Sequence, residues 1–388
     1  RLFRPTLVFT PSDTTEVVMS VEYGETEGNG AAWTNVTAQQ AGAQADFTTS
    51  SDENGFTNIE WTQGVLEVNI DEVGNGTLTN IMGARRVKAN SAADIDGTDL
   101  PIFAAPGFTD QKQFSNELRW AGNVTDNWDT TFGLYYFTQD IGYREARYIW
   151  LPPPLGPAPF GVNLTRVLGG DMESRNTGIF WNNDFALSDS WTLTAGLRYT
   201  RESKSAEIVD STPIADGGPG PCGDVVSFVC PTISLNRDWE NITPKLGVQF
   251  FMNDDAHLYA FWSKGFRSGG FNFRNAKPTV IPPGPTDEEE NNTFEIGVKA
   301  DMLDGRMRLN VAAFHNSIDD MQRELNLGDP DVIVLQGTIN AGDVTIKGVE
   351  LDVVGLLTEN FSVNASYGWQ DGEYDSVNPA FASFLGPE

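Results

Sequence analysis

The chain has 388 residues, with 54 Asp and Glu against 25 Lys and Arg, and a formal net charge of −29. Because so negative a surface repels a phosphate backbone, nucleic acid is not expected as a partner. No run approaches the roughly 18 consecutive apolar residues of a transmembrane helix, so only a β-barrel, with every backbone amide paired, would carry this chain through a bilayer.

Fourteen segments are predicted to be strands, several of which alternate cleanly between apolar and polar residues, and no helical period of useful length appears. In the segment 191–200, for example, Trp191, Leu193 and Leu197 fall on one face and Arg198 on the other. The predicted strands are 1–9, 16–23, 57–70, 76–89, 110–122, 128–144, 174–187, 190–208, 238–253, 256–274, 290–303, 306–324, 331–357 and 361–374. The segment 331–357 is interrupted by three glycines, and the faces of 256–274 cannot be assigned from its pattern.

Short and long connections alternate between these strands. The short ones, rich in Asp, Asn, Ser and Gly, are 11–15, 72–76, 125–127, 187–190, 252–255, 303–305 and 358–360. The long ones are 24–56, 90–109, 145–173, 209–237, 275–289, the region around 325–330, and the residues after 374. This asymmetry predicts an antiparallel, up-and-down transmembrane β-barrel with short periplasmic turns and long outer loops.

The apolar stripe of each strand is expected to face lipid, and the polar stripe to line the lumen. Trp128, Trp191 and Phe361 each follow a short turn directly, which is typical of an aromatic belt at the headgroup level. The alternative is that aromatic residues are simply good strand formers.

Cys222 and Cys230 lie in one Gly/Pro-rich loop with seven residues between them. Two nearby cysteines in a long loop predict a local disulfide formed outside the cytoplasm. Two free thiols or a weak metal pair are the alternatives. Neither His257 nor His315 is near enough in sequence to suggest zinc.

No motif for catalysis, phosphate binding or zinc is present, so neither an enzyme, a cofactor nor a metal is expected. Asp94, Asp96 and Asp99 form a D-x-D-G-x-D cluster that echoes a calcium loop. The cluster lacks the bidentate Glu at the twelfth position, so an ordinary solvated turn is favoured.

Charged residues also gather near the outer end of the later strands. The acidic run 288–290 is typical of a solvated face. Four basic residues at the same rim fit an anionic chelate, lipopolysaccharide phosphates or neighbouring carboxylates; they are Lys264, Arg267, Arg274 and Lys277. The residues that contact a ligand are not identified.

Several segments, in order, resemble the barrel strands of TonB-dependent outer-membrane receptors. They are residues 114–121 (FSNELRWA), 133–137 (GLYYF), 243–247 (TPKLG), 259–272, 294–299 (FEIGVK) and 347–350 (KGVE). The resemblance implies a 22-stranded barrel around an N-terminal plug, located in the bacterial outer membrane. Residues 1–388 would then be a partial barrel domain of about fourteen strands, an interior piece without the plug, the TonB box or the last strands, roughly eight strands short of 22.

The resemblance also implies a function. The leading hypothesis is active uptake of a scarce, large ligand, most often a ferric siderophore, powered by the TonB complex acting on the plug region. Oligosaccharide, haem or cobalamin remain open as ligands. A passive porin-like or structural barrel is the second hypothesis, and a secreted soluble β-sandwich binding module is the third. The first two imply outer-membrane lipid and lipopolysaccharide as partners.

Overall fold

The computed structural model of the chain describes residues 1–42, 45, 48–151, 162–209, 214–215, 230–274, 280–329, 333–379 and 381–382. Strands dominate the described residues. They are β1 (Leu2–Phe3), β2 (Thr6–Ser12), β3 (Thr15–Gly28), β4 (Phe56–Ile70), β5 (Gly76–Ala92), β6 (Phe103–Ala104), β7 (Gly107–Thr125), β8 (Trp128–Leu151), β9 (Val162–Ser188), β10 (Trp191–Val209), β11 (Ile214–Ala215), β12 (Thr232–Asn253), β13 (Ala256–Arg267), β14 (Glu289–Met302), β15 (Met307–Asp329), β16 (Ile333–Thr358) and β17 (Phe361–Tyr374). A single-turn helix, α1 (Val36–Gln40), lies between β3 and β4. No helix in the described ranges has the length and apolar character to cross a membrane.

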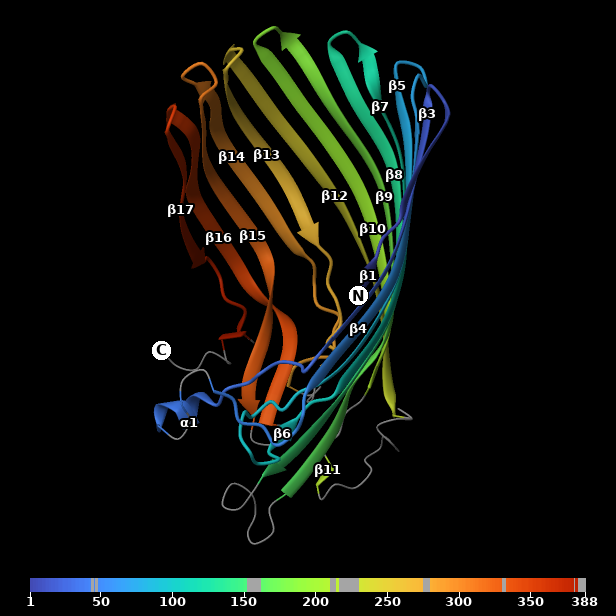
Figure 1. Cartoon of the computed structure of the whole chain (residues 1–388), viewed down its shortest axis with the longest axis vertical. Coiled ribbons are helices and arrows are strands. Elements are labelled where there is room, and N and C mark those ends of the chain that lie inside the picture. Colours follow the sequence, from blue (N-terminus) through green and yellow to red (C-terminus); the bar gives the residue numbers. More distant parts are fainter. Residues whose placement is uncertain are drawn as a thin grey trace.

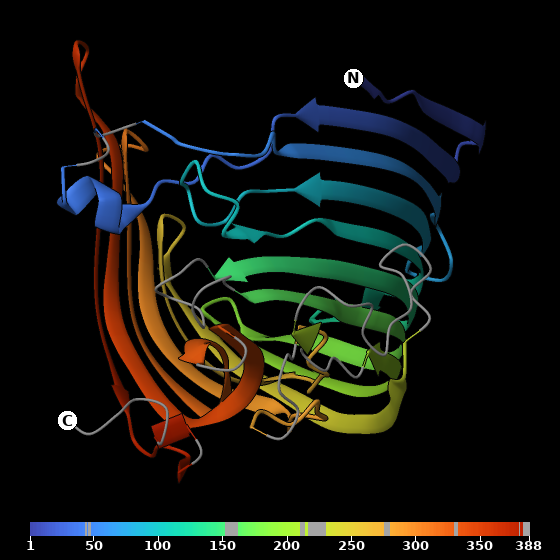
Figure 2. The same cartoon turned by 90° about the horizontal axis from the view of Figure 1, so that it is seen from below.

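The strands form one curved antiparallel sheet. From β2 onward each long strand pairs with the next long strand along the chain, and the two-residue strands β1, β6 and β11 pair with β3, β8 and β9. The sheet curves into an open trough (Figures 1 and 2). Among the described residues, β2 pairs only with β3 and β17 only with β16, so both edges are bare. The prediction of an antiparallel, up-and-down arrangement of about fourteen strands, incomplete as a barrel, is confirmed.

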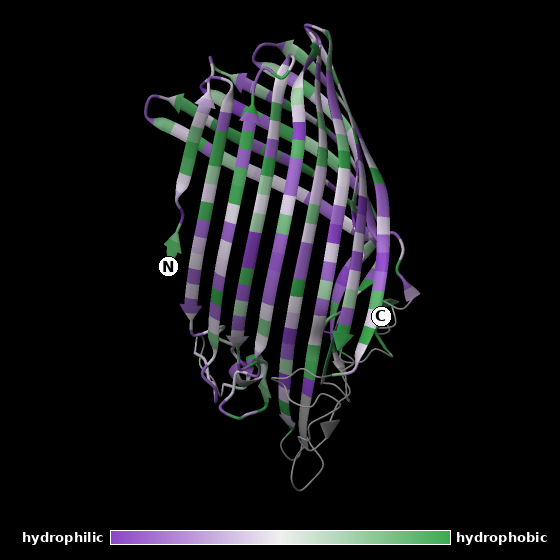
Figure 3. Ribbon diagram, turned by 90° about the vertical axis from the view of Figure 1, so that its right-hand side faces the viewer, coloured by the Kyte–Doolittle hydropathy of each residue, from purple (hydrophilic) through white to green (hydrophobic). Residues whose placement is uncertain are grey.

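The two faces of the sheet differ in polarity. Hydrophobic and hydrophilic residues alternate along the strands (Figure 3). On β10, Leu197 is 50% exposed, whereas Thr200 on the opposite face is 3% exposed. Lys204 shares the face of Thr200 and donates to Ser268 Oγ (2.8 Å) and to the carbonyl of Gly269 (2.7 Å), in the segment that follows β13. Because that segment lies inside the trough, the concave face is the polar one (Figure 2).

The apolar stripe is limited in height. On β10 it runs from Trp191 to Tyr199, and Arg201 then occupies the next position on the same face. A strand needs roughly 9–11 residues to cross a bilayer at a tilt, so this stripe has the expected length. The stripe begins with aromatic pairs beside the short turns: Trp128 stacks on Phe185 at 5.4 Å between ring centroids, and Trp191 lies tilted against Phe250 at 4.6 Å.

The predicted strand boundaries are mostly correct at the short turns and are wrong at several of the long loops, although β10 ends within a residue of its predicted end and β17 ends at Tyr374 as predicted. β8 continues to Leu151, whereas the predicted strand ended at 144. β9 already starts at Val162, whereas the prediction was 174–187. β15 continues to Asp329, whereas the prediction ended at 324. β12 begins six residues before the predicted 238. β13 ends at Arg267 and not at 274, because Ser-Gly-Gly follows and the backbone turns into the trough.

The first predicted strand, 1–9, is divided into β1 and β2. Pro5 lies between them and has no amide hydrogen to give to the ladder. The interrupted segment 331–357 is one strand, β16, and its Gly342 has a positive φ of 140°.

The largest buried apolar cluster lies at the long-loop end, where the ends of β9, β15 and β16 meet the segment after β13. It contains Leu168, Ile281, Leu325, Leu335, Ala341 and Phe381. The β15–β16 hairpin reaches it by bending at Asp320 (φ 53°) and Gly342, where the register of the two strands shifts beside Met321. Figure 2 shows this hairpin turning inward over the trough.

Candidate functional site

A buried arginine joins two hairpins across the mouth of the trough, the end at which the long loops lie. Arg147 on β8 is 1% exposed and donates from Nε to Glu145 Oε1 (2.6 Å). Its other nitrogens donate to the carbonyl of Val334 (3.3 Å) and to the Gln336 side chain, both on β16. These contacts clasp the β15–β16 hairpin to β8, although 187 residues separate Arg147 from Val334 along the chain.

Glu145 is the centre of this clasp. Besides Arg147, it accepts hydrogen bonds from Arg274 Nε (3.0 Å) and from the Tyr143 hydroxyl. The carboxylate is nearly buried, so the two guanidinium groups compensate a charge that water does not reach. The segment after β13, which carries Arg274, is thereby fixed to the wall.

A second cluster on the concave face surrounds an indole. Trp239 on β12 is 3% exposed, and Lys204 and Arg237 lie over its ring at 5.3 and 5.5 Å. Lys204 pairs with Glu202 (2.9 Å), and Arg237 pairs with Asp287 (2.7 Å). The indole Nε1 is buried and has no hydrogen-bond partner among the described residues. The cluster therefore combines an aromatic ring with neutralised charges at the mouth.

Nearer the short turns, the concave face holds a small cavity of about 250 Å³ between β10, β12, β13 and β14. Its lining includes Lys245 and Lys299, which lie over the rings of Phe261 and Tyr259 at 5.6 Å each. The Tyr259 hydroxyl donates to Glu295 (2.8 Å). This part of the lumen is polar and charged, as expected for a surface that meets water or another polar polypeptide.

The basic rim predicted from the sequence does not form one group. Lys264 pairs with Glu290 (2.8 Å) and Arg274 with Glu145 (3.0 Å), so neighbouring carboxylates neutralise both. Arg267 is exposed and forms no ion pair with another described residue. Lys277 lies outside the described residues. The acidic run 288–290 is not wholly solvated, because Glu289 accepts from the amide of Gln322 and Glu290 is bound by Lys264.

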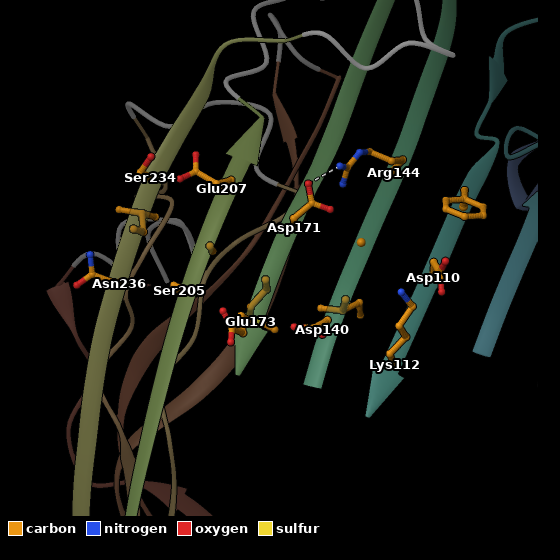
Figure 4. Close-up of a pocket in the computed structure, with 16 residues that line it drawn as sticks. Asp110, Lys112, Asp140, Arg144, Asp171, Glu173, Ser205, Glu207, Ser234 and Asn236 are labelled. Atoms are coloured by element: carbon orange, nitrogen blue, oxygen red, sulfur yellow. Dashed lines mark hydrogen bonds and ion pairs between the residues drawn. The ribbon is translucent and has the colours of Figure 1, made fainter. Parts of the chain in front are cut away.

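The convex face carries a groove of about 570 Å³ between the apolar stripe and the long loops, across β7, β8, β9, β10 and β12. Figure 4 shows its charged lining, in which Arg144 pairs with Asp171 (2.6 Å). Acidic side chains outnumber Lys112 and Arg144 there. Because it opens on the convex face, this groove is separate from the lumen.

The three carboxylates of the calcium-like motif lie in the connection between β5 and β7. Asp96 accepts from the amides of Thr98 (3.1 Å) and Phe103 (2.8 Å), and Asp99 accepts from Ser50 (3.4 Å). Asp94 is buried, and this burial, with the neighbouring Asp96, raises the pKa of its carboxyl group. Among the described residues, no three His, Cys, Asp or Glu side chains converge as a ready metal site.

The predicted disulfide is not tested. Cys222 lies outside the described residues, and Cys230 packs beside Val167 and Val209. The pairing stays a prediction.

Arg147 and Trp239 were not singled out by the sequence. Both lie in strand ends beyond the apolar stripe, where alternation no longer distinguishes a buried side chain from a solvated one. In the sequence, these two residues were marked as possible site residues only by being an arginine and a tryptophan on the polar side of their strands.

Residues 6–385 match the protein family described as "TonB dependent receptor-like, beta-barrel". The chain is 32% identical over 131 residues to the metal-pseudopaline receptor CntO of Pseudomonas aeruginosa, an alignment that covers 34% of this chain and 17% of that receptor. It is 23% identical over 262 residues to the probable TonB-dependent siderophore receptor PiuA of Acinetobacter baumannii, covering 65% of this chain and 30% of PiuA.

Two solved structures show the same fold. The ferric yersiniabactin uptake receptor FyuA from Yersinia pestis superposes with a TM-score of 0.71 at 16% identity, covering 96% of this chain and 52% of FyuA. The copper transporter OprC superposes with a TM-score of 0.69 at 12% identity, covering 98% of this chain and 54% of OprC. The chain thus spans about half the length of these two structures.

Proposed function

The chain belongs to the TonB dependent receptor-like β-barrel family, and we propose that it forms much of the wall of a receptor that imports a ferric siderophore. It is a protein of the bacterial outer membrane, and its apolar convex stripe faces lipid. The named relatives are receptors and transporters, not enzymes. The soluble β-sandwich alternative is wrong, because residues such as Leu197 and Ile296 are 50% and 61% exposed and are not packed against a second sheet.

The observation that carries the proposal is the family match over nearly the whole chain, joined to a polar concave face. Relatives named for siderophore and metal-chelate uptake favour a metal chelate over a glycan or cobalamin. The mouth clusters around Arg147 and Trp239 offer hydrogen bonds and an aromatic surface, which suit a large polar ligand. Uptake powered through TonB, and contact with lipopolysaccharide, are part of the same proposal.

Uptake by living cells tests the proposal. A strain deleted for the gene that encodes this chain is compared with its complemented parent for accumulation of ⁵⁵Fe supplied on a panel of siderophores. We expect one chelate to lose most of its uptake in the deletion strain and to require a functional TonB system. Passive diffusion through a porin-like barrel would instead persist without TonB. Unchanged uptake of every chelate, with a defect on copper or a glycan, would refute the ferric siderophore.

A further inference from the structure

A polar cavity of about 480 Å³ lies between the β3–β4 connection and the β5–β7 connection. Oxygen-bearing side chains make up much of its lining, among them Asn29, Ser51, Glu53, Asn54 and Asp94. Asp94 is bridged to Ala104, which pairs with Tyr148 beside Arg147. No residue of the Arg147 clasp or of the Trp239 cluster lines the cavity, and nothing above assigns it a role.

Asp94 is the anomaly in this cavity. Asp94 is only 6% exposed, and its Oδ1 accepts hydrogen bonds from the backbone amides of Asp96 (3.1 Å) and Gly97 (3.3 Å). Its Oδ2 is fully covered, yet no described residue donates to it with acceptable geometry. The hydroxyl of Ser51 is beside the carboxylate but donates to the carbonyl of Glu53 (2.5 Å). A buried carboxylate oxygen without a partner is costly unless a proton or a bound cation neutralises it.

We propose that this cavity binds a calcium ion, with Asp94 Oδ2 as the anchoring ligand. Calcium takes 6–8 oxygen ligands from carboxylates, amide and backbone carbonyls and water. The side chains of Glu53, Asn54 and Asn29 supply oxygens of those kinds in the same cavity. With few carboxylates, the site belongs to the weak extracellular class, with a dissociation constant of about 10⁻⁴–10⁻³ M.

This site differs from the one suggested by the D-x-D-G-x-D spacing. Both carboxylate oxygens of Asp96 are occupied by donors of its own turn, and Asp99 binds Ser50. Neither is a ligand in the proposal. Of the three, Asp94 lines the cavity, and its Oδ2 accepts no hydrogen bond from a described residue.

The two connections are already held together around the cavity. Asn35 Nδ2 donates to the carbonyl of Asp96 (2.9 Å). Gly97, with a φ of 63°, packs so closely that an added Cβ would lie 3.0 Å from the amide nitrogen of Asn35. A bound ion would therefore join two segments that approach each other in its absence, so little ordering opposes binding.

Terbium luminescence tests the site, because Tb³⁺ replaces Ca²⁺ and is excited by a nearby indole. Trp33 lines the same cavity. The full-length protein in detergent is titrated with Tb³⁺ alone and then with competing Ca²⁺. We expect saturable emission that millimolar Ca²⁺ displaces, an affinity for Tb³⁺ at least tenfold weaker in Asp94→Asn, and an affinity within twofold of the wild type in Asp99→Asn.

Trp33→Phe should lower the emission while leaving calcium affinity by calorimetry unchanged. Circular dichroism confirms that each variant is folded, and Asp94→Asn keeps the size of the side chain. The inference fails if the folded wild type gives no saturable emission, or if Asp94→Asn binds Tb³⁺ as tightly as the wild type. Either result would mean that Asp94 is simply protonated. The outcome does not depend on which chelate the receptor imports.

Discussion

At the scale of single residues, Arg147 shows how a buried charge fixes an outer hairpin. Replacing Arg147 with Met would leave Glu145 with only Arg274 and Tyr143 as donors. It would also remove the hydrogen bonds from Arg147 to Val334 and Gln336. Removing one partner of a buried ion pair costs about 3–5 kcal/mol. We expect faster hydrogen exchange in residues 333–341 and a lower free energy of unfolding, measured by denaturant titration.

The matched control is Arg175→Met. Arg175 also pairs with a glutamate two residues away, Glu173, but both side chains are largely exposed. Exposed pairs contribute about 0–1 kcal/mol, so this variant should change neither measurement appreciably. Equal losses in the two variants would contradict a structural role for the clasp.

Asn183 is a polar residue on the lipid-facing side and only 5% exposed. It accepts from Trp128 Nε1 (3.0 Å) and Thr130 Oγ1 (2.9 Å) and donates to the carbonyl of Ala195 (3.3 Å). Asn183→Leu would leave the Trp128 indole N–H without its acceptor beside hydrocarbon, at a cost of about 1–3 kcal/mol, whereas Thr130 would keep its bond to the Asn182 carbonyl. We expect a lower urea midpoint for unfolding in lipid vesicles, followed by tryptophan fluorescence. Asn310→Leu, on the concave face, should have little effect.

At the scale of the strand, the assignment of faces predicts opposite responses to one substitution. Leu197 on β10 is 50% exposed within the lipid-facing stripe, whereas Gln249 on β12 lines the small concave cavity. Arginine on the lipid face costs up to about 2–4 kcal/mol. Leu197→Arg should therefore lower the yield of heat-resistant folded protein on cold SDS gels, and Gln249→Arg should not. If Gln249→Arg were the worse of the two, the faces would be reversed.

The strands also show which part of the fold the sequence could predict. Strand starts beside short turns were placed to within a residue, as at Trp128, Gly76 and Phe361, because lipid and lumen impose strict alternation there. Beyond the stripe both faces are wet or covered by loops. Val167 and Leu168 are adjacent and both buried, which no two-residue period predicts. The start of β9 was therefore misplaced by twelve residues.

The candidate site was less predictable still. The partners of Arg147 on β16 depend on the inward bend at Asp320 and Gly342, and bends of this kind carry no composition signal beyond a glycine. Lys264 and Arg274 were recognised as rim cations, but their carboxylate partners come from β14 and β8. Only the folded arrangement shows that these charges are neutralised.

At the scale of the whole molecule, the two bare edges dominate the energetics of the 388-residue chain in a membrane. β2 and β17 each leave one row of amide and carbonyl groups unpaired among the described residues, and each such group costs several kcal/mol in hydrocarbon. Unpaired edges pair with other chains when they can. We therefore expect this chain, refolded alone into lipid vesicles, to associate edge to edge rather than remain a monomer.

Cysteine cross-linking measures this association in a background with Cys222→Ser and Cys230→Ser. Ala365→Cys places a thiol on the edge strand β17, and Ala300→Cys places one on β14, which is paired on both sides. A short bismaleimide should join two chains through position 365 and not through position 300. Adding strands that continue the sheet past β17 should abolish the cross-link, because the edge then has its partner. A monomer without cross-links at either position would mean that β2 and β17 close on each other in lipid, and that the open trough is not the membrane form of this chain.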